Sequence, residues 1–293
     1  MTKTMTAAAI EDLRNRDLLS VETPLDRFLS GFSQADTIRL KHLLDHSSGL
    51  QDYYAWPEYA ARRSEPVRDS AFTAIARTRK RDFAPGKGSA YSNTGYHLLA
   101  SVIERVSGTS YAQFLATVLF PRAGWPGCSE PPIPAGWQLA PSSDPGFPPS
   151  RLQPAARVGD GWLKGNGSVV CSAPGLFRWA ESTRSHWIRA SSQLDRRYGW
   201  GLRKRFGRDL LEQTGRVPTG YVSYLGVYPS DDLIIVVLSS TQADVSEKMG
   251  TDLAAIALGK LCTTRECGNW GWCPGCAMGR LRHHPQSTGR CDE

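Results

Sequence analysis

The sequence lacks long hydrophobic runs and lacks blocks of like charge, and both absences narrow the possible functions. No apolar run approaches the roughly 18 residues that a membrane-spanning helix needs, so no membrane span is predicted. The formal net charge is +7, but the basic residues are scattered apart from one short block at residues 77–81. Scattered arginines are typical of a solvated surface rather than of a nucleic-acid-binding patch. With 293 residues and no internal repeat, the chain is long enough for one large domain or two lobes.

The most informative stretch is residues 83–96, which contains Tyr91 and Asn93. Pro85-Gly86 predicts a turn, because proline fixes φ and glycine adopts conformations that other residues avoid. The following residues repeat apolar side chains at helical spacing, and Gly108 predicts the end of that helix. The tyrosine and the asparagine therefore lie on a tight loop that leads into a helix anchored in a core. Taken alone, the pair is also compatible with a half-buried loop tyrosine.

In its wider context this stretch resembles the second motif of the penicillin-recognising serine hydrolases, which are the class C β-lactamases, D-alanyl-D-alanine carboxypeptidases and related esterases. In that family the tyrosine is a general base or proton relay for a serine, and the asparagine hydrogen-bonds the substrate's amide. The resemblance implies these roles for Tyr91 and Asn93. It extends over roughly residues 1–260, and it implies an α+β fold in which helices and an antiparallel sheet flank the active-site cleft.

The resemblance matches Lys3 to the lysine of the family's first motif, Ser-x-x-Lys. Residues i and i+3 share one face of a helix, so this lysine lies beside the serine hydroxyl, and a desolvated lysine can help to deprotonate it. The serine would fall one residue before Met1, and no serine in the chain stands three residues before a lysine. We therefore expect the chain to be truncated just after the nucleophile and, as given, to be inactive. The alternative for Lys3 is an ordinary surface lysine near the terminus.

The family's third motif is usually Lys or His, then Thr or Ser, then Gly, and this chain has Gln213, Thr214 and Gly215 in its place. The glycine lets a substrate lie against the strand edge, and the next backbone N–H, that of Arg216, would complete an oxyanion hole. The resemblance thus implies substrate-binding roles for all four residues. Because Gln213 carries no charge, it cannot attract a substrate carboxylate, which favours a neutral ester or amide over a β-lactam or a D-alanine carboxylate.

Two patterns are similar to metal sites, and we interpret neither as one. His42 and His46 have the i, i+4 spacing of a zinc pair, but no third ligand is spaced to match, and the resemblance makes this segment scaffold. Residues 262–293 contain Cys262, Cys267, Cys273 and Cys276, for which a zinc knuckle is the alternative to an appended or frame-shifted tail. We expect no metal and no cofactor, and we assign the domain to residues 1–261 with the tail outside the fold.

For the fold we expect an all-helical part over about residues 1–190, with one amphipathic helix at residues 37–50. A closing helix is expected at residues 244–261, after three strands at residues 198–206, 221–228 and 233–239. The family's first strands come from sequence upstream of the nucleophile. The N-terminal strands are therefore expected to be missing, which leaves an apolar sheet edge unpaired.

Two functions from different classes follow. The first is a serine hydrolase that acts through an acyl-enzyme on an amide, a β-lactam or an ester, with this chain as a fragment of it. The second is a non-catalytic pseudo-enzyme that binds a ligand in the same cleft, or the product of a decayed gene. In both cases the expected partner is a small-molecule or peptide-like substrate, with no nucleic acid involved.

Overall fold

The computed structural model describes residues 1–32, 35–121, 127–144, 152–183, 198–243 and 245–260. The chain divides into two compact units, Met1–Gly250 and Thr251–Glu293. The first unit holds the strands and the helices that position the site. The cysteine-rich stretch at residues 262–293 lies outside the described residues. No helix in the described part is both long enough and apolar enough to cross a membrane.

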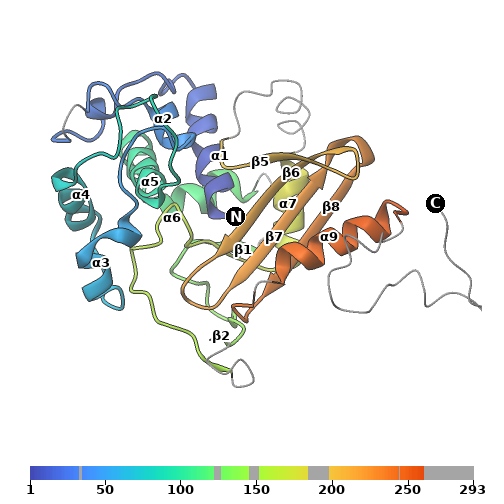
Figure 1. Ribbon diagram of the computed structural model, residues 1–293. Coiled ribbons are helices and arrows are strands. Elements are labelled where there is room, and N and C mark those ends of the chain that lie inside the picture. The colour runs from blue at the N-terminus through green and yellow to red at the C-terminus, as the bar shows by residue number, and fades with distance from the viewer. Residues whose placement is uncertain (33–34, 122–126, 145–151, 184–197, 244, 261–293) are drawn as a thin grey trace, which may run out of the picture. The chain divides into compact units, whose positions relative to one another are not determined.

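Two long helices, α1 (Thr2–Asn15) and α5 (Asn93–Ser107), pack against each other in the helical part (Figure 1). The α5 helix begins where the Ser92 hydroxyl accepts a hydrogen bond from the Gly95 N–H, and it ends at Gly108 with φ of 73°. Both ends follow from capping chemistry, and the predicted helix end at Gly108 is confirmed. The shorter helices are η1 (Leu25–Arg27), α2 (Leu40–Leu44), η2 (Tyr53–Ala55), α3 (Pro57–Arg62), α4 (Asp69–Thr78), α6 (Tyr111–Phe114) and η3 (Leu115–Leu119).

The single helix expected over residues 37–50 is wrong. Only α2 is helical there, because the chain turns away at His46 and Gly49, whose φ angles are 62° and 74°. Gly49 passes so close to Phe83 that an added Cβ would lie 2.0 Å from the Phe83 carbonyl oxygen. This packing, and not helical periodicity, sets the path of the segment.

The sheet of the first unit has four antiparallel strands in the order β5 (Gly201–Arg205), β6 (Arg208–Arg216), β7 (Val222–Tyr228) and β8 (Leu233–Ser239) (Figure 1). The prediction of three strands is wrong, because it took the start of β6 for a turn. Phe206 and Gly207, with φ of 54° and 71°, make a tight connection that pairs Arg205 with Arg208 directly. Hairpins favour such two-residue connections with positive φ at both positions.

The sequence Gln213–Arg216 therefore lies within strand β6 and not between two strands. Each of its residues pairs with β7, and Gly215 is opposite Ser223. Within the described residues the two sheet edges differ. The β5 edge carries Arg203, Lys204 and Arg205, whereas β8 is apolar and is the last strand of the sheet on the other side.

The part before the sheet is not all helical, which corrects a third expectation. Strand β1 (Cys128–Ser129) pairs with β4 (Val170–Cys171), and β2 (Ser143–Asp144) pairs with β3 (Gln153–Pro154). A disulfide joins Cys128 to Cys171 across the first pair. Directly after β4, the Ser172 hydroxyl caps α7 (Ala173–Ser182) by accepting the Gly175 N–H. The closing helix is α9 (Ser246–Ala257), shorter than residues 244–261.

Candidate active site

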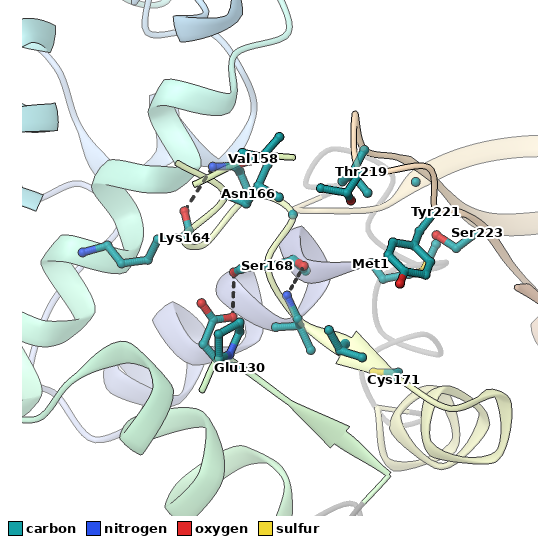
Figure 2. A pocket seen from close by; sticks show the side chains of 18 of the residues that line it. Met1, Glu130, Val158, Lys164, Asn166, Ser168, Cys171, Thr219, Tyr221 and Ser223 are labelled. Atoms are coloured by element: carbon teal, nitrogen blue, oxygen red, sulfur yellow. Dashed lines mark hydrogen bonds between the residues drawn. The ribbon is translucent and has the colours of Figure 1, made fainter. Parts of the chain in front are cut away.

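One cavity of about 1740 Å³ opens between the first turn of α1, the loop before α5, the segment of residues 158–172 and strand β6. Figure 2 shows part of its lining, including Met1 and Ser223 on the side of the sheet. The structure brings all seven predicted site residues to the wall of this cavity. They are Lys3, Tyr91, Asn93, Gln213, Thr214, Gly215 and Arg216.

Lys3 is buried in the first turn of α1, with 5% of its surface exposed. Its Nζ donates hydrogen bonds to Asn93 Oδ1 at 2.7 Å and to the backbone carbonyl of Asn166 at 2.9 Å. It also lies over the ring of Tyr91, 4.8 Å from the centroid. The interpretation of Lys3 as an ordinary surface lysine is therefore wrong, because two separate segments, at residues 91–93 and at Asn166, hold its buried amine in place.

Burial lowers the pKa of Lys3 from 10.5 to about 7, and the nearby Asp52 carboxylate opposes part of this shift. A lysine with such a pKa is substantially uncharged at neutral pH, so it can accept a proton. A partly uncharged amine therefore lies at the cavity wall.

Asn93 is held from both ends of its side chain. Its Oδ1 accepts from Lys3, and its Nδ2 donates to Asp52 Oδ2 at 2.9 Å. The Asp52 carboxylate also accepts the Tyr54 N–H at 3.2 Å. Because Nδ2 must face the carboxylate and Oδ1 the amine, these contacts fix the orientation of the amide.

Tyr91 presents its side chain to the cavity, with 60% of its surface exposed. Within the described residues its hydroxyl makes no hydrogen bond to another protein group. Partial burial and the Asp52 carboxylate raise its pKa to about 12. The phenol is therefore protonated at neutral pH, where it can relay a proton, whereas the Lys3 amine is the group of the two that is substantially in its proton-accepting form.

The loop that carries Tyr91 is held by His46. The two rings lie 4.7 Å apart, and His46 Nδ1 accepts the Ser92 N–H at 3.2 Å. Burial is the main cause that lowers the pKa of His46 to about 4, so the ring is neutral and free to accept this bond.

His42 Nδ1 likewise accepts the Arg39 N–H. In the described part of the chain no three His, Cys, Asp or Glu side chains are grouped as metal ligands.

On the opposite wall, residues 213–216 of strand β6 line the cavity. Gly215 passes so close to Ser223 that an added Cβ would lie 2.4 Å from the Ser223 Oγ. The Gln213 side chain is used within the protein, because its Nε2 donates a hydrogen bond to the Gly199 backbone carbonyl at 2.6 Å. Gly199 in turn passes close to the Lys3 carbonyl, so Gln213 helps to position the first turn of α1.

Two residues of the site were missed from the sequence, Asp52 and Asn166. Asp52 orients Asn93, and Asn166 is held by the Tyr53 hydroxyl and by the backbone carbonyls of Trp162 and Lys164. Their contacts join segments that are 41 and 163 residues apart in the sequence, so no local motif points to them.

The sequence model of the beta-lactamase family matches residues 1–259. The chain belongs to this family. The match confirms the resemblance and the α+β fold, and it places the cavity and its lining residues in a family of serine-hydrolase type.

Relatives and solved structures agree with this assignment. Penicillin-binding protein 4* of Bacillus subtilis is 40% identical over 127 residues, which are 42% of this chain and 28% of that protein. A D-aminopeptidase of Gluconobacter oxydans is 25% identical over 286 residues, 88% of this chain and 51% of that protein. This chain therefore spans about half or less of the length of these relatives.

Among solved structures, the D-amino acid amidase of Ochrobactrum anthropi SV3 superposes with a TM-score of 0.73 at 16% identity. The superposition covers 88% of this chain and 82% of that one. At this identity the likeness concerns the fold alone.

Proposed function

We propose that the chain carries the base and the binding groups of a serine hydrolase that acts through an acyl-enzyme on an ester or amide that lacks a carboxylate. The observation that carries the proposal is the position of the Lys3 amine. It is buried, it is held by Asn93 and Asn166, it lies over Tyr91, and it has a pKa of about 7.

The nucleophile in this proposal is a serine that precedes Met1 in the encoded protein. Lys3 is the fourth residue counted from that position, so the serine lies one helical turn before the lysine and on the same face. Met1 lines the cavity beside Gly215, whose Cβ position is 3.8 Å from the Met1 nitrogen. A serine just before it lies between the amine and strand β6.

The reaction then proceeds in two steps, which are formation of the acyl-enzyme and its hydrolysis. Lys3 takes the serine proton, and the serine oxygen attacks the substrate carbonyl. The oxyanion that forms accepts hydrogen bonds from backbone N–H groups at the start of the helix and in β6. Tyr91 gives its proton to the leaving alcohol or amine and takes up the proton held by Lys3, which returns the lysine to its neutral form. Water, deprotonated in the same way, then releases the acyl group and restores the serine.

The substrate class follows from charge and from the relatives. Gln213 is neutral and bonded to the Gly199 carbonyl, so the position that usually attracts a substrate carboxylate has no cation here. The named activities of the relatives, D-aminopeptidase and D-amino acid amidase, concern D-amino acid derivatives. These favour an ester or amide of a D-amino acid.

The test is hydrolysis of D-alanine p-nitroanilide by the protein translated with the codons upstream of Met1. Activity that disappears in Lys3→Ala, and that falls strongly in Tyr91→Phe, supports the proposal. Binding of the substrate without turnover in the extended, folded protein contradicts it and favours the non-catalytic pseudo-enzyme.

A further inference from the structure

Glu130 is a buried carboxyl group at the cavity wall that the reaction does not use. It follows strand β1, has 8% of its surface exposed, and lines the same cavity as Lys3 (Figure 2). In the described part of the chain its side chain makes one hydrogen bond, in which the Ser168 hydroxyl donates to Oε2 at 2.6 Å. No basic side chain of the described residues lies within ion-pair distance of it.

The Lys164 amine, whose charge partly offsets the rise in the pKa of Glu130, is already paired with other carboxylates. The amine of Lys164 donates to Asp69 and, at 2.9 Å, to Glu104. Burial raises the pKa of Glu130 to about 8. A carboxylate offers about four acceptor positions, and a single hydroxyl fills only one of them. With a pKa of about 8 the group is largely protonated at neutral pH while the cavity holds no cation, and it keeps acceptor positions for a donor that enters the cavity.

A short segment ties Glu130 to the reacting groups. The carbonyl of Asn166 accepts from Lys3, Ser168 donates to Glu130, and the Val169 N–H donates to Thr2 Oγ1 at 3.1 Å. One short stretch, residues 166–169, thus contacts both the start of α1 and the buried carboxyl. A molecule that reaches Lys3 shares its cavity with Glu130.

We propose that Glu130, oriented by Ser168, is a subsite that binds an ammonium group of the substrate. A cation at this position supplies the charge partner that the described residues do not, and it restores the ionised carboxylate in a site where burial strengthens the pairing. The proposal rests on the proposed function, since it specifies that the acyl-donor substrate carries a free amine.

The test compares two probes that differ in one group. D-alaninamide carries an ammonium where D-lactamide carries a hydroxyl, and both are titrated into the full chain with NMR detection of the backbone amides. We expect D-alaninamide to bind roughly tenfold more tightly than D-lactamide, with shifts at residues 127–130 and 168. In Glu130→Gln, which keeps the shape of the side chain, the two affinities become equal while that of D-lactamide is unchanged.

Two further variants keep the test decisive. Asp160→Asn removes one negative charge from the same cavity at an exposed position and is expected to leave the preference intact. Should Glu130→Gln not fold, Glu130→Asp keeps the charge but withdraws it by one methylene, and it is expected to weaken D-alaninamide binding alone. Equal binding of the two probes to the unaltered chain, or a preference that survives in Glu130→Gln, overturns the proposal.

Binding needs no serine, so the outcome is independent of hydrolysis. If the protein prefers the ammonium probe because of Glu130 but never hydrolyses the substrate, the subsite is supported and the proposed function is wrong. Turnover of D-alanine p-nitroanilide with no role for Glu130 does the reverse.

Discussion

The amine of Lys3 and the side-chain oxygen of Asn93 lie 2.7 Å apart, although 90 residues separate them in the sequence. Asn93 can accept this bond only because Asp52 holds the other end of its amide at 2.9 Å. The three side chains form one chain of contacts that places the lysine and sets the charge around it.

The first prediction concerns the titration of Lys3. Its folded-state pKa of about 7 is below the ordinary value of 10.5, so between these values the folded protein holds fewer protons than the unfolded chain. The free energy of unfolding therefore rises with pH between pH 7 and 10.5. The cost of burying a charged Lys3 is fully present below pH 7. Relative to Lys3→Met, the unaltered chain should gain up to about 1.4 kcal/mol per pH unit between pH 7 and 10.

Urea denaturation of both proteins across that range measures the difference, and the NMR shift of the Lys3 Cε gives the midpoint directly. A midpoint near 10, or a stability difference that does not change with pH, contradicts the assignment of Lys3 as a neutral base.

The second prediction concerns Asp52. In Asp52→Asn the negative charge that raises the pKa of Lys3 is lost, and the midpoint of Lys3 should move to lower pH. The loss of a charged acceptor for the Asn93 amide and the Tyr54 N–H should also destabilise the fold by about 1.5–3 kcal/mol. The exposed Asp160→Asn is the matched control and should do neither. An unchanged Lys3 midpoint in Asp52→Asn would show that Asp52 is only structural.

A third prediction concerns Gly175 in α7, where two effects have opposite signs. Helix propensity alone says that Gly175→Ala should stabilise by about 1 kcal/mol. An added Cβ would, however, lie 2.4 Å from the carbonyl oxygen of Gly127, which is backbone and cannot rotate away. We expect the contact to dominate and to destabilise the protein by about 1–3 kcal/mol in thermal unfolding. A rise in the melting temperature would mean that the backbone at Gly127 yields easily.

The fourth prediction concerns the disulfide between Cys128 and Cys171, which closes a loop of 43 residues. A cross-link over a loop of this length restricts the unfolded chain and is worth about 4 kcal/mol in the chain-entropy model. Reduction, or the Cys128→Ser/Cys171→Ser double variant, should lower the urea midpoint accordingly. The double variant must be insensitive to reductant; a reductant effect in it would trace the stability change to another cause.

Much of the site was predictable because its motifs are local. Tyr91 and Asn93 lie on one turn before a capped helix, and Lys3 lies at a fixed spacing from the expected serine, so short patterns identify them. Asp52 and Asn166 escape this reasoning, because their roles arise only when distant segments meet. The same limit applies to Glu130, which no motif marks.

The fold was predicted in class but not in detail, for physical reasons that differ by region. Strand β6 was missed at its start because the tight turn at Phe206 and Gly207 leaves no loop between β5 and β6. The helix expected over residues 37–50 failed because apolar spacing was outweighed by the close approach of Gly49 to Phe83. The short strands at Cys128 and Cys171 are two residues each, too short for an alternating pattern.

The measurement that tests the account most directly is the mass of the extended protein after treatment with a fluorophosphonate probe, with the modified residue located by peptide sequencing. The account predicts a single adduct on a serine immediately before Met1, formed slowly or not at all in Lys3→Ala. If the upstream codon does not encode serine, or the adduct forms elsewhere in the chain, Lys3 does not serve a serine nucleophile and the proposed reaction is wrong.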